Sequence, residues 1–511
     1  MPKYKVFAAI DVGSTAISMK IIQITKKNGL CPLDTVVYQM SLGKETYATG
    51  KITYSSVEKI CGIMADFVRI MQEYQVDDYT AYATTAVREA SNSEYIIDQI
   101  NLRTGIKVTM INNEEEHFLH NKALALNVDC FDTMIEEGAE IIDVSSGSVQ
   151  ISFYQNSKLN YSQSVPMGSL RVFELLSDLE SRTVTFSGLL EEYIKASVEQ
   201  YKRNFFRTED YQNFIIYGNG LSNLKLLCGK EDPYLAYEDL NKVHRILEKK
   251  SPEQISEEYE IPYESAILLL PTVLIYKNFL ASSQKNILAP DCSLVDGICV
   301  EYAEKNTYIH TKHIFTNDII SSVICYADKY HCDKNHYEAV TEYAVSIFNA
   351  LSKKFGLNKR DCVLLKVASI LQDTGLYINI NSSSKYSYDI VKANSILGLS
   401  EKEHEIVAYT VLFQNGGISV DVPEYKSLSK SRKLLISKLS AILSLAKTLD
   451  MTYQQKIMRI KSTFKDGTLF ITANTDEDIT LESWKFYIAA EFFKEVFGIK
   501  TELSKKYGYI K

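Results

Sequence analysis

Two aspartates, Asp11 and Asp143, each come at the end of an apolar run that reads as a buried strand, and a turn of small residues follows each of them. Small residues let the backbone N–H groups of a turn point at one centre, which is how a loop binds phosphate oxygens. A carboxylate beside such a turn can hold a metal ion or a water. The turn residues are Gly13, Ser14 and Thr15 in the first case, and Ser145, Ser146, Gly147 and Ser148 in the second. They suggest phosphate chemistry, although an ordinary turn between two core strands would also account for either copy taken alone.

Both turns are expected to lie at the first bend of a three-stranded β-meander. In each copy a second strand follows the turn, and a third strand comes next, at 35–42 in the first copy and at 158–165 in the second. Internal duplication is a strong indication of architecture. Two phosphate-type loops from duplicated halves, facing each other over a cleft, are typical of the actin-like fold, so the sequence predicts an α/β protein with two such lobes.

Polar residues also follow two further strands of the first half. The predicted strand at 79–83 leads to Arg88, and the one at 108–111 leads to a helix start that contains Glu116. Open α/β sheets keep their sites at the carboxyl ends of strands, so both side chains are expected to face the same cleft as the aspartates. The alternatives are that acids in a first helical turn only complement the helix dipole, and that Arg88 forms a surface ion pair with Glu89.

The second half contains one more candidate phosphate turn. A predicted strand at 214–217 runs into Gly218-Asn-Gly220 and then into a helix. This order occurs at nucleotide and phosphate turns in many folds, although alone it is a weak signal. We therefore count Gly218 and Gly220 among the candidate substrate-binding residues.

Length and composition indicate a globular protein of several domains. A chain of 511 residues is too long for one core, and 46% hydrophobic with 23% charged residues is the balance of a soluble globular protein. The pattern predicts actin-like lobes at 1–130 and 131–305, a helical domain at 306–456 and a small α+β domain at 457–511.

Charge and cysteine usage restrict the expected partners and compartment. A net charge of −8 gives no reason to expect nucleic acid or a membrane as partner. The chain starts without a signal-peptide pattern and no apolar run approaches ~18 residues, so we expect a cytoplasmic protein. The nine cysteines show no C-x-x-C spacing, which indicates reduced, mostly buried thiols and argues against a zinc site.

With these segments identified, the chain resembles the exopolyphosphatase and guanosine pentaphosphate phosphatase (Ppx/GppA) family along nearly its whole length. The most specific shared segment is Thr85-Ala-Val-Arg-Glu-Ala-Ser-Asn92. The other shared segments are Asp11-Val-Gly-Ser14, Glu115-Glu116, Asp143-Val-Ser-Ser-Gly147-Ser148, Met167-Gly168 and Gly218-Asn-Gly220. Downstream, the helical region is similar to the HD-type domain of longer members, and the last residues are similar to their small fourth domain.

The resemblance implies hydrolysis of a terminal phosphoanhydride with Mg²⁺, or possibly with Mn²⁺, in the cleft. It implies that Glu116 is the general base, that Asp143 and Glu116 hold the metal, and that Arg88 neutralises the terminal phosphoryl group. Phosphoryl transfer needs placement and charge neutralisation more than a covalent nucleophile, which suits these residue types. The expected substrate-binding residues are Asp11, Gly13, Ser14, Thr15, Ser145, Ser146, Gly147, Ser148, Gln150, Gly218 and Gly220.

The chain departs from the family pattern at the second turn. Ser145 and Ser146 replace two glycines, and Gln150 replaces an acid. Glutamine still forms hydrogen bonds but lacks a charge that could hold Mg²⁺, so metal affinity comes into question. In the first turn Thr15 stands where the family usually has asparagine.

The helical region keeps few of the ligands that an HD-type metal centre needs. Such a centre gathers histidines and aspartates on its metal ions. His336, Asp373 and Asp450 occupy ligand positions, whereas Gln372, Tyr386 and Gln414 occupy positions of the other ligands. We therefore expect a structural or ligand-binding domain with a degenerate HD-type site.

A basic cluster in the same region is the candidate binding surface for a long polyphosphate chain. Its residues are Lys426, Lys430, Arg432, Lys433 and Lys438. A solvated helix face with lysines for solubility is an equally good explanation.

The leading function hypothesis is an exopolyphosphatase that releases orthophosphate from chain ends, and the runner-up is a guanosine pentaphosphate 5′-phosphatase. A non-catalytic regulator that binds polyphosphate or an alarmone is motivated by Gln150 and the altered turn. A small-molecule kinase of the actin-like fold is disfavoured, because Arg88 and Glu116 match hydrolases better. The resemblance also suggests a homodimer.

Overall fold

The computed structural model describes residues 4–27, 29–180, 185–205, 211–280, 286–418 and 422–506. The chain forms two compact units, Met1–Phe315 and Thr316–Lys511. Within the described residues, no helix is both long enough and apolar enough to span a membrane.

The first lobe of the first unit contains a five-stranded sheet in the order β3-β2-β1-β4-β5. Its strands are β1 (Lys5–Val12), β2 (Ala16–Thr25), β3 (Gly29–Gln39), β4 (Asp78–Ala83) and β5 (Val108–Met110). The first three strands pair antiparallel, whereas β4 runs parallel to β1 and β5 parallel to β4. The third strand spans Gly29–Gln39 instead of the predicted 35–42. It ends before Leu42 because Leu42 starts a helix.

The second lobe repeats this topology with the order β10-β11-β9-β6-β7-β8. Its strands are β6 (Ala139–Val144), β7 (Val149–Gln155), β8 (Lys158–Val165), β9 (Asn213–Gly218), β10 (Tyr234–Leu235) and β11 (Ile287–Leu288). Again three strands form an antiparallel meander, and the first of them pairs parallel with the next strand along the chain, β9. The predicted duplication and the α/β, actin-like fold class are thus confirmed.

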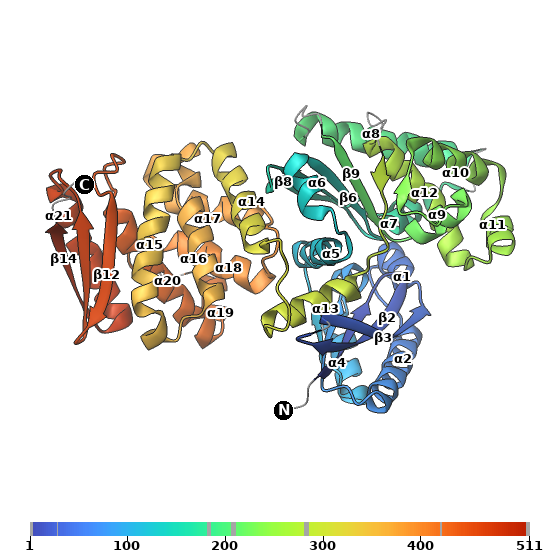
Figure 1. Ribbon diagram of the computed structural model, residues 1–511, viewed down its shortest axis with the longest axis horizontal. Coiled ribbons are helices and arrows are strands. Elements are labelled where there is room, and N and C mark those ends of the chain that lie inside the picture. Colours follow the sequence, from blue (N-terminus) through green and yellow to red (C-terminus); the bar gives the residue numbers. More distant parts are fainter. Residues whose placement is uncertain are drawn as a thin grey trace. The chain divides into compact units, whose positions relative to one another are not determined.

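Helices cover the sheets of both lobes (Figure 1). Those of the first lobe are α1 (Leu42–Thr49), α2 (Tyr54–Glu73), α3 (Thr85–Glu89), α4 (Ser93–Thr104) and α5 (Asn113–Asn127). Those that follow are α6 (Phe131–Glu137), α7 (Ser169–Ser177), α8 (Phe186–Phe205), α9 (Leu221–Cys228), α10 (Tyr237–Lys249), α11 (Pro252–Tyr259), α12 (Tyr263–Phe279) and α13 (Leu294–Lys305). The segment at 263–279 is apolar on nearly all faces, which predicts a buried helix, and it forms α12.

Successive side chains of β1 point to opposite faces of the sheet, and each face packs against its own layer of helices. The even-numbered residues of β1, such as Ala8 and Ile10, join a core with α2 and α4, whereas Phe7 and Ala9 join a second core with α13. Although the sequence analysis groups 294–305 with the second lobe, α13 packs against α5 and β1 of the first. The chain thus returns to the first lobe before the first unit ends.

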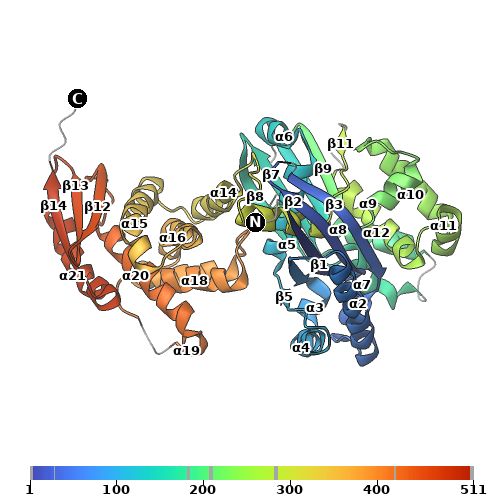
Figure 2. The same cartoon turned by 60° about the horizontal axis from the view of Figure 1, so that its bottom comes forward.

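The second unit combines a helical region with a small sheet. Its helices are α14 (Phe315–Lys329), α15 (Lys334–Phe355), α16 (Lys359–Leu371), α17 (Ser383–Ala393), α18 (Glu401–Leu412), α19 (Pro423–Ser427), α20 (Lys430–Thr448) and α21 (Thr480–Phe497), with two 3₁₀ turns at Thr374–Tyr377 and Ile380–Ser382. Its strands are β12 (Arg459–Lys465), β13 (Thr468–Asn474) and β14 (Lys500–Lys506). Figure 2 shows α21 lying along this sheet.

Near the end of the chain, Asp466-Gly467 predicts a hairpin turn and Gly498 predicts the end of the last helix, and both predictions are confirmed. The hairpin between β12 and β13 turns at Asp466 and Gly467, both of which have positive φ. The last helix ends at Gly498, which adopts the left-handed conformation that glycine tolerates best.

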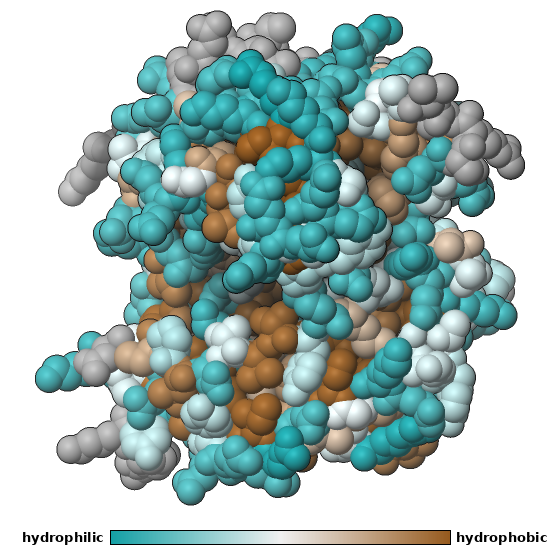
Figure 3. Space-filling view, turned by 90° about the vertical axis from the view of Figure 1, so that its right-hand side faces the viewer, coloured by the Kyte–Doolittle hydropathy of each residue, from teal (hydrophilic) through white to brown (hydrophobic). Residues whose placement is uncertain are grey.

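Figure 3 shows one face of the first unit. Hydrophilic side chains cover much of its upper part, and hydrophobic side chains gather in the lower part. Exposed apolar residues of the first lobe include Leu33, Val37 and Leu102. Exposed apolar residues are normal on folded proteins and indicate no function by themselves, although Val37 also lines the cavity described below.

Glu140 on β6 is a buried carboxyl group that should make stability depend on pH. Burial raises the pKa of this carboxyl to about 8, although nearby Lys202 lowers it, while 4.5 is the ordinary value. The folded protein therefore binds the proton more tightly than the unfolded chain does, and stability falls as the pH rises from about 4.5 through about 8. At about pH 9, Glu140→Gln should raise the free energy of unfolding by on the order of 2 kcal/mol, whereas at about pH 5 it should change little.

Denaturant unfolding of the wild type and the variant at both pH values measures this effect. Glu136→Gln, which changes an exposed acid close in sequence, is the matched control and should leave the pH dependence unchanged. If Glu140→Gln gave no gain in stability at the higher pH, the buried carboxyl would not be the source of the pH dependence.

Candidate functional site

A cavity of about 240 Å³ lies where the two duplicated turns face each other. Ten of the predicted site residues line it, namely Asp11, Gly13, Ser14, Thr15, Glu116, Asp143, Ser145, Ser146, Gly147 and Gly218. Residues that sequence reasoning missed also line it, among them Thr84, Thr85, His120, Asn219 and Cys292. The two aspartates and Glu116 therefore share one cavity.

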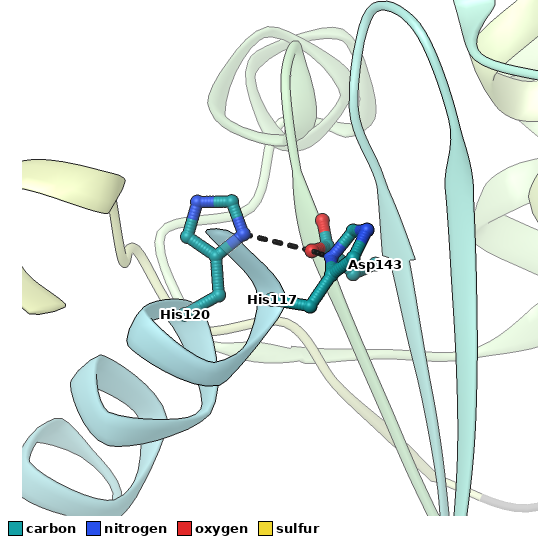
Figure 4. A group of neighbouring side chains, drawn as sticks. All are labelled: His117, His120 and Asp143. Atoms are coloured by element: carbon teal, nitrogen blue, oxygen red, sulfur yellow. Dashed lines mark hydrogen bonds and ion pairs between the residues drawn. The ribbon is translucent and has the colours of Figure 1, made fainter. Parts of the chain in front are cut away.

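Two histidines of α5 hold the carboxylate of Asp143 (Figure 4). His117 and His120 lie three positions apart, and so on one face of the helix. Nδ1 of His117 donates to Oδ2 of Asp143 at 2.5 Å, and Nδ1 of His120 donates to the same oxygen at 2.8 Å. The side chains of His117 and Asp143 are 0% and 1% exposed, so this contact is shielded from water.

Glu116 lies in the first turn of α5, between the helix cap and the histidines. Asn112 caps the helix by accepting from the backbone N–H of Glu115 at 2.8 Å, and the Glu115 carboxylate accepts from the backbone of Asn112 in return. Glu115 therefore stabilises the start of the helix. Glu116 is only 6% exposed and lines the cavity instead.

Arg88 lies beside Glu116 but outside the lining of the cavity. Its Nη1 is 3.8 Å from Oε2 of Glu116. Its guanidinium also donates to the carbonyl of Ile111, to Oδ1 of Asn113 and, at 2.9 Å, to Oγ1 of Thr85. These contacts fix Arg88 behind the carboxylate of Glu116.

The second turn is closed by its own serines. Oγ of Ser145 donates to the carbonyl of Ser148 at 3.0 Å, and the two hydroxyl oxygens lie 3.3 Å apart. Oγ of Ser146 accepts from the side-chain amide of Asn219 at 2.7 Å. The serines that replace family glycines therefore stiffen the turn by hydrogen bonds within the lobe.

Contacts between the lobes hold this turn against the first lobe. Nε of Arg171 donates to the carbonyl of Gly147 at 2.7 Å, and its Nη2 lies 2.6 and 2.7 Å from the two carboxylate oxygens of Glu89. Glu89 therefore pairs with Arg171. The alternative considered above, a surface ion pair between Arg88 and Glu89, is not formed. A Cβ at Gly147 would lie 2.5 Å from Thr85 and 2.6 Å from the hydroxyl of Tyr47, so only glycine allows this approach.

The charges in the cavity perturb one another strongly. Burial, together with the charge of Glu116, raises the pKa of Asp11 to about 7. Burial would also raise the pKa of Asp143, but His120 and His117 hold it well below its usual range. Burial lowers the pKa of His120, yet the charge of Asp143 and the hydrogen bond to it raise that pKa to about 9. The cavity therefore gathers carboxylates with one cationic imidazole.

The remaining candidates of the first unit lie beside the cavity. The side-chain amide of Gln150 on β7 donates to Oγ of Ser162 on β8, and so does not face the cavity. Ser148 completes the turn. Gly220 begins α9 with a φ of +80°.

Gly297 on α13 lets this helix approach the back of α5. An added Cβ would overlap the backbone carbonyl of Leu119. Because backbone cannot swing aside, Gly297→Ala should displace α5 together with its site residues and lower the stability by about 2 kcal/mol. Thermal unfolding measures this, with Gly62→Ala on α2 as control.

Gly62 is an exposed helix position with no heavy atom near the added methyl group. This control should therefore stabilise the protein by about 0.5–1 kcal/mol. Equal stability of the two variants would show that the approach of the helices is not tight.

The basic cluster of the second unit is largely engaged in local contacts. Nη1 of Arg432 lies 2.7 Å from Glu405, Nζ of Lys433 donates to the carbonyl of Lys426, and Nζ of Lys438 donates to the carbonyl of Phe355. Lys426 and Lys430 are exposed. The surface therefore presents fewer free cations than the sequence suggests.

The HD-like residues of the second unit do come together, around a lysine. Nδ1 of His336 is 2.8 Å from Asp450, and its Nε2 is 3.2 Å from Asp373. Nζ of Lys447 donates at 2.8 Å to both Asp373 and Gln414. The ammonium group thus lies among the remaining ligand positions and supplies a positive charge there.

The residues that sequence reasoning missed differ in how clearly the sequence pattern could have indicated them. His117 and His120 carry one, since the i, i+3 spacing directly after Glu116 places both rings on one face. Lys447 carries none, because its partners come from other segments, distant in sequence.

Comparison with known proteins identifies the family. A model described as the Ppx/GppA phosphatase family matches residues 21–212, and one described as Ppx/GppA phosphatase, domain III, matches residues 320–505. The structure also resembles a crystal structure of an exopolyphosphatase from Cytophaga hutchinsonii, with a TM-score of 0.50 and 19% identity over 59% of this chain and 98% of that one. A likeness at this identity shows the fold alone.

Curated relatives are distant. A bifunctional 3-dehydroquinate synthase/phosphatase of Fusobacterium nucleatum is 23% identical over 41% of this chain and 32% of its own length. Exopolyphosphatase 1 of Mycobacterium tuberculosis is 24% identical over 32% of this chain and 46% of its own length. The chain thus spans less than half of these relatives.

A third relative is matched over most of its length. A guanosine-5′-triphosphate,3′-diphosphate pyrophosphatase of Pseudoalteromonas translucida is 21% identical over 80% of both chains. The two family models together cover well over half of the sequence, and the chain therefore belongs to the Ppx/GppA phosphatase family.

Proposed function

We propose that the protein is an exopolyphosphatase that hydrolyses terminal phosphoanhydride bonds of inorganic polyphosphate and releases orthophosphate. The observation that supports this most is that Asp11, Glu116 and Asp143 line one cavity below two small-residue turns. Turns of this kind offer N–H groups to phosphate oxygens, and the carboxylates can handle a metal ion and a water.

The cavity is suited to a divalent cation. Among its described lining residues there is no lysine or arginine. Oδ1 of Asp11, Oε2 of Glu116 and Oδ1 of Asp143 are buried, and within the described part of the chain they have no hydrogen-bond partner. Carboxylate oxygens left in this way fit a cation such as Mg²⁺ or Mn²⁺, and Asp143 and Glu116 would hold it. When bound, the ion supplies the positive charge that a terminal phosphoryl group needs.

The protein's own residues supply the general base, orient Asp143 and bind the phosphate oxygens. Glu116 accepts the proton of the attacking water, and Arg88, whose Nη1 lies 3.8 Å from that carboxylate, adds a positive charge beside it. The imidazoles of His117 and His120 fix the orientation of Asp143. The turns at Ser14 and Gly147 bind phosphate oxygens. Because phosphoryl transfer has a loose transition state, positioning and charge account for most of the acceleration.

Phosphate release from long-chain polyphosphate in the presence of Mg²⁺ or Mn²⁺ tests the proposal, with guanosine pentaphosphate as the competing substrate. We expect faster release from polyphosphate. A strong preference for the nucleotide would favour the pentaphosphate phosphatase, a candidate that the pyrophosphatase relative supports by its long match. Tight polyphosphate binding without any turnover would favour a regulator instead.

A further inference from the structure

The pair of imidazoles on Asp143 distinguishes this cavity from an all-oxygen magnesium site. Both Nδ1 atoms lie within hydrogen-bond distance of one carboxylate oxygen, and one ligand atom from each of the three residues lies within 4.8 Å of the others. We propose that His117, His120 and Asp143 bind a first-row transition-metal ion of the Zn²⁺ or Fe²⁺ class. The inference deepens the proposed phosphatase function and rests on it, because Asp143 belongs to both.

The donor set supports this class of ion. Imidazole nitrogen binds zinc, iron and related ions well, whereas Mg²⁺ prefers oxygen ligands in octahedral geometry and keeps much of its water. Two nitrogens and one carboxylate leave positions open for water and phosphate oxygens, which is the arrangement of catalytic rather than structural sites. Histidine ligation would thus give this cavity a metal preference that carboxylates alone do not.

Little movement is needed to convert the hydrogen bonds into metal bonds. Ligands at about 2.0–2.2 Å from a tetrahedral ion lie about 3.3–3.5 Å from one another. The Nδ1 atoms now lie 2.5 and 2.8 Å from the carboxylate oxygen, so each must retreat by less than about 1 Å. On binding, each Nδ1 gives up its proton and its lone pair binds the metal. In a neutral ring the proton moves to Nε2, whereas the cationic ring of His120 already has a proton on Nε2 and releases the Nδ1 proton to solvent.

A second observation points to a cation independently of the histidines. Oδ1 of Asp143 and Oε2 of Glu116 are buried without a hydrogen-bond partner among the described residues, and their residues are 1% and 6% exposed. An unpaired buried carboxylate oxygen is costly, and a metal ion is a partner that removes the cost. Arg88, at 3.8 Å from Glu116, provides only a distant charge.

The test is metal binding to the full chain after chelation, followed by titration calorimetry with Zn²⁺ and with Mg²⁺. We expect His120→Gln to weaken Zn²⁺ binding by at least about tenfold and Mg²⁺ binding by less than about threefold. His244→Gln, which alters a buried histidine of α10 outside the cavity, is the matched control and should leave both affinities unchanged. Circular dichroism verifies that each variant is folded.

Cobalt absorption keeps the inference testable if a variant does not fold. Co²⁺ bound to the wild type should show intense visible bands of nitrogen ligation, and Zn²⁺ should abolish them. Unchanged Zn²⁺ affinity in folded His120→Gln, or a cobalt spectrum of oxygen ligation only, would mean that the histidines merely orient Asp143. Histidine-dependent Zn²⁺ binding without phosphate release would support the metal site while refuting the phosphatase. Phosphate release with histidine-independent metal binding would support the phosphatase while refuting the metal site.

Discussion

Glu116→Gln is expected to slow phosphate release from polyphosphate by about 10²- to 10⁴-fold, the usual contribution of a positioned general base. Glutamine keeps the shape and the hydrogen-bonding capacity of the side chain but cannot accept the proton of the attacking water. The carboxylate is 6% exposed and lines the cavity, with Arg88 at 3.8 Å, so bulk water cannot easily take over its role. Single-turnover release of orthophosphate, measured with saturating metal, gives the rate of the chemical step.

Glu114→Gln is the matched control, because it makes the same chemical change in the same helical turn. Glu114 does not line the cavity, and the variant should keep the wild-type rate. With the metal ion at a saturating concentration, polyphosphate binding by Glu116→Gln should remain within about threefold of the wild type, since the metal site is filled and the change adds no bulk. A Glu116→Gln rate within tenfold of the wild type would assign the base elsewhere.

Much of the fold could be predicted because its evidence is local and repeated. Asp11 and Asp143 each end a strand and precede a small-residue turn, and this pattern determined the duplicated meanders before any contact was known. Turn and helix ends such as Gly467 and Gly498 were likewise readable from residue type. These signals depend on backbone conformation, which neighbouring residues decide.

The orientations of individual side chains could not be predicted in the same way. Gln150 pairs with Asp143 in the register of β6 and β7, as an acid at that position would, yet its amide donates to Ser162 on the next strand. Arg88 follows a strand as expected, but carbonyl and amide oxygens from the segment around Ile111 and Asn113 hold it outside the cavity. Such choices depend on partners that sequence order does not reveal.

Lys447→Met is expected to destabilise the second unit by about 3–5 kcal/mol, the usual cost of leaving a buried charge without its partner. The ammonium group donates to Asp373 and Gln414, and it is 20% exposed. It holds the pKa of Asp373 well below its usual range, although burial alone would raise it. Methionine fills similar space but leaves that carboxylate with His336 and Tyr453 only. Hydrogen exchange of α16 and α20 amides measures the loss, since these helices should open at least about 100-fold more often.

The double variant Lys447→Met with Asp373→Asn separates lost charge pairing from lost packing. Once the carboxylate is neutral, the missing ammonium group no longer leaves a buried charge unpaired. The double variant should therefore be less destabilised than the sum of the two single variants, by at least about 1 kcal/mol. Strict additivity would mean that Lys447 contributes by packing alone. A Lys447→Met protein with wild-type exchange rates would mean that His336 and Tyr453 suffice to hold Asp373. The favoured result is the coupled one, because the Lys447 ammonium group lies 2.8 Å from the Asp373 carboxylate, which is only 7% exposed.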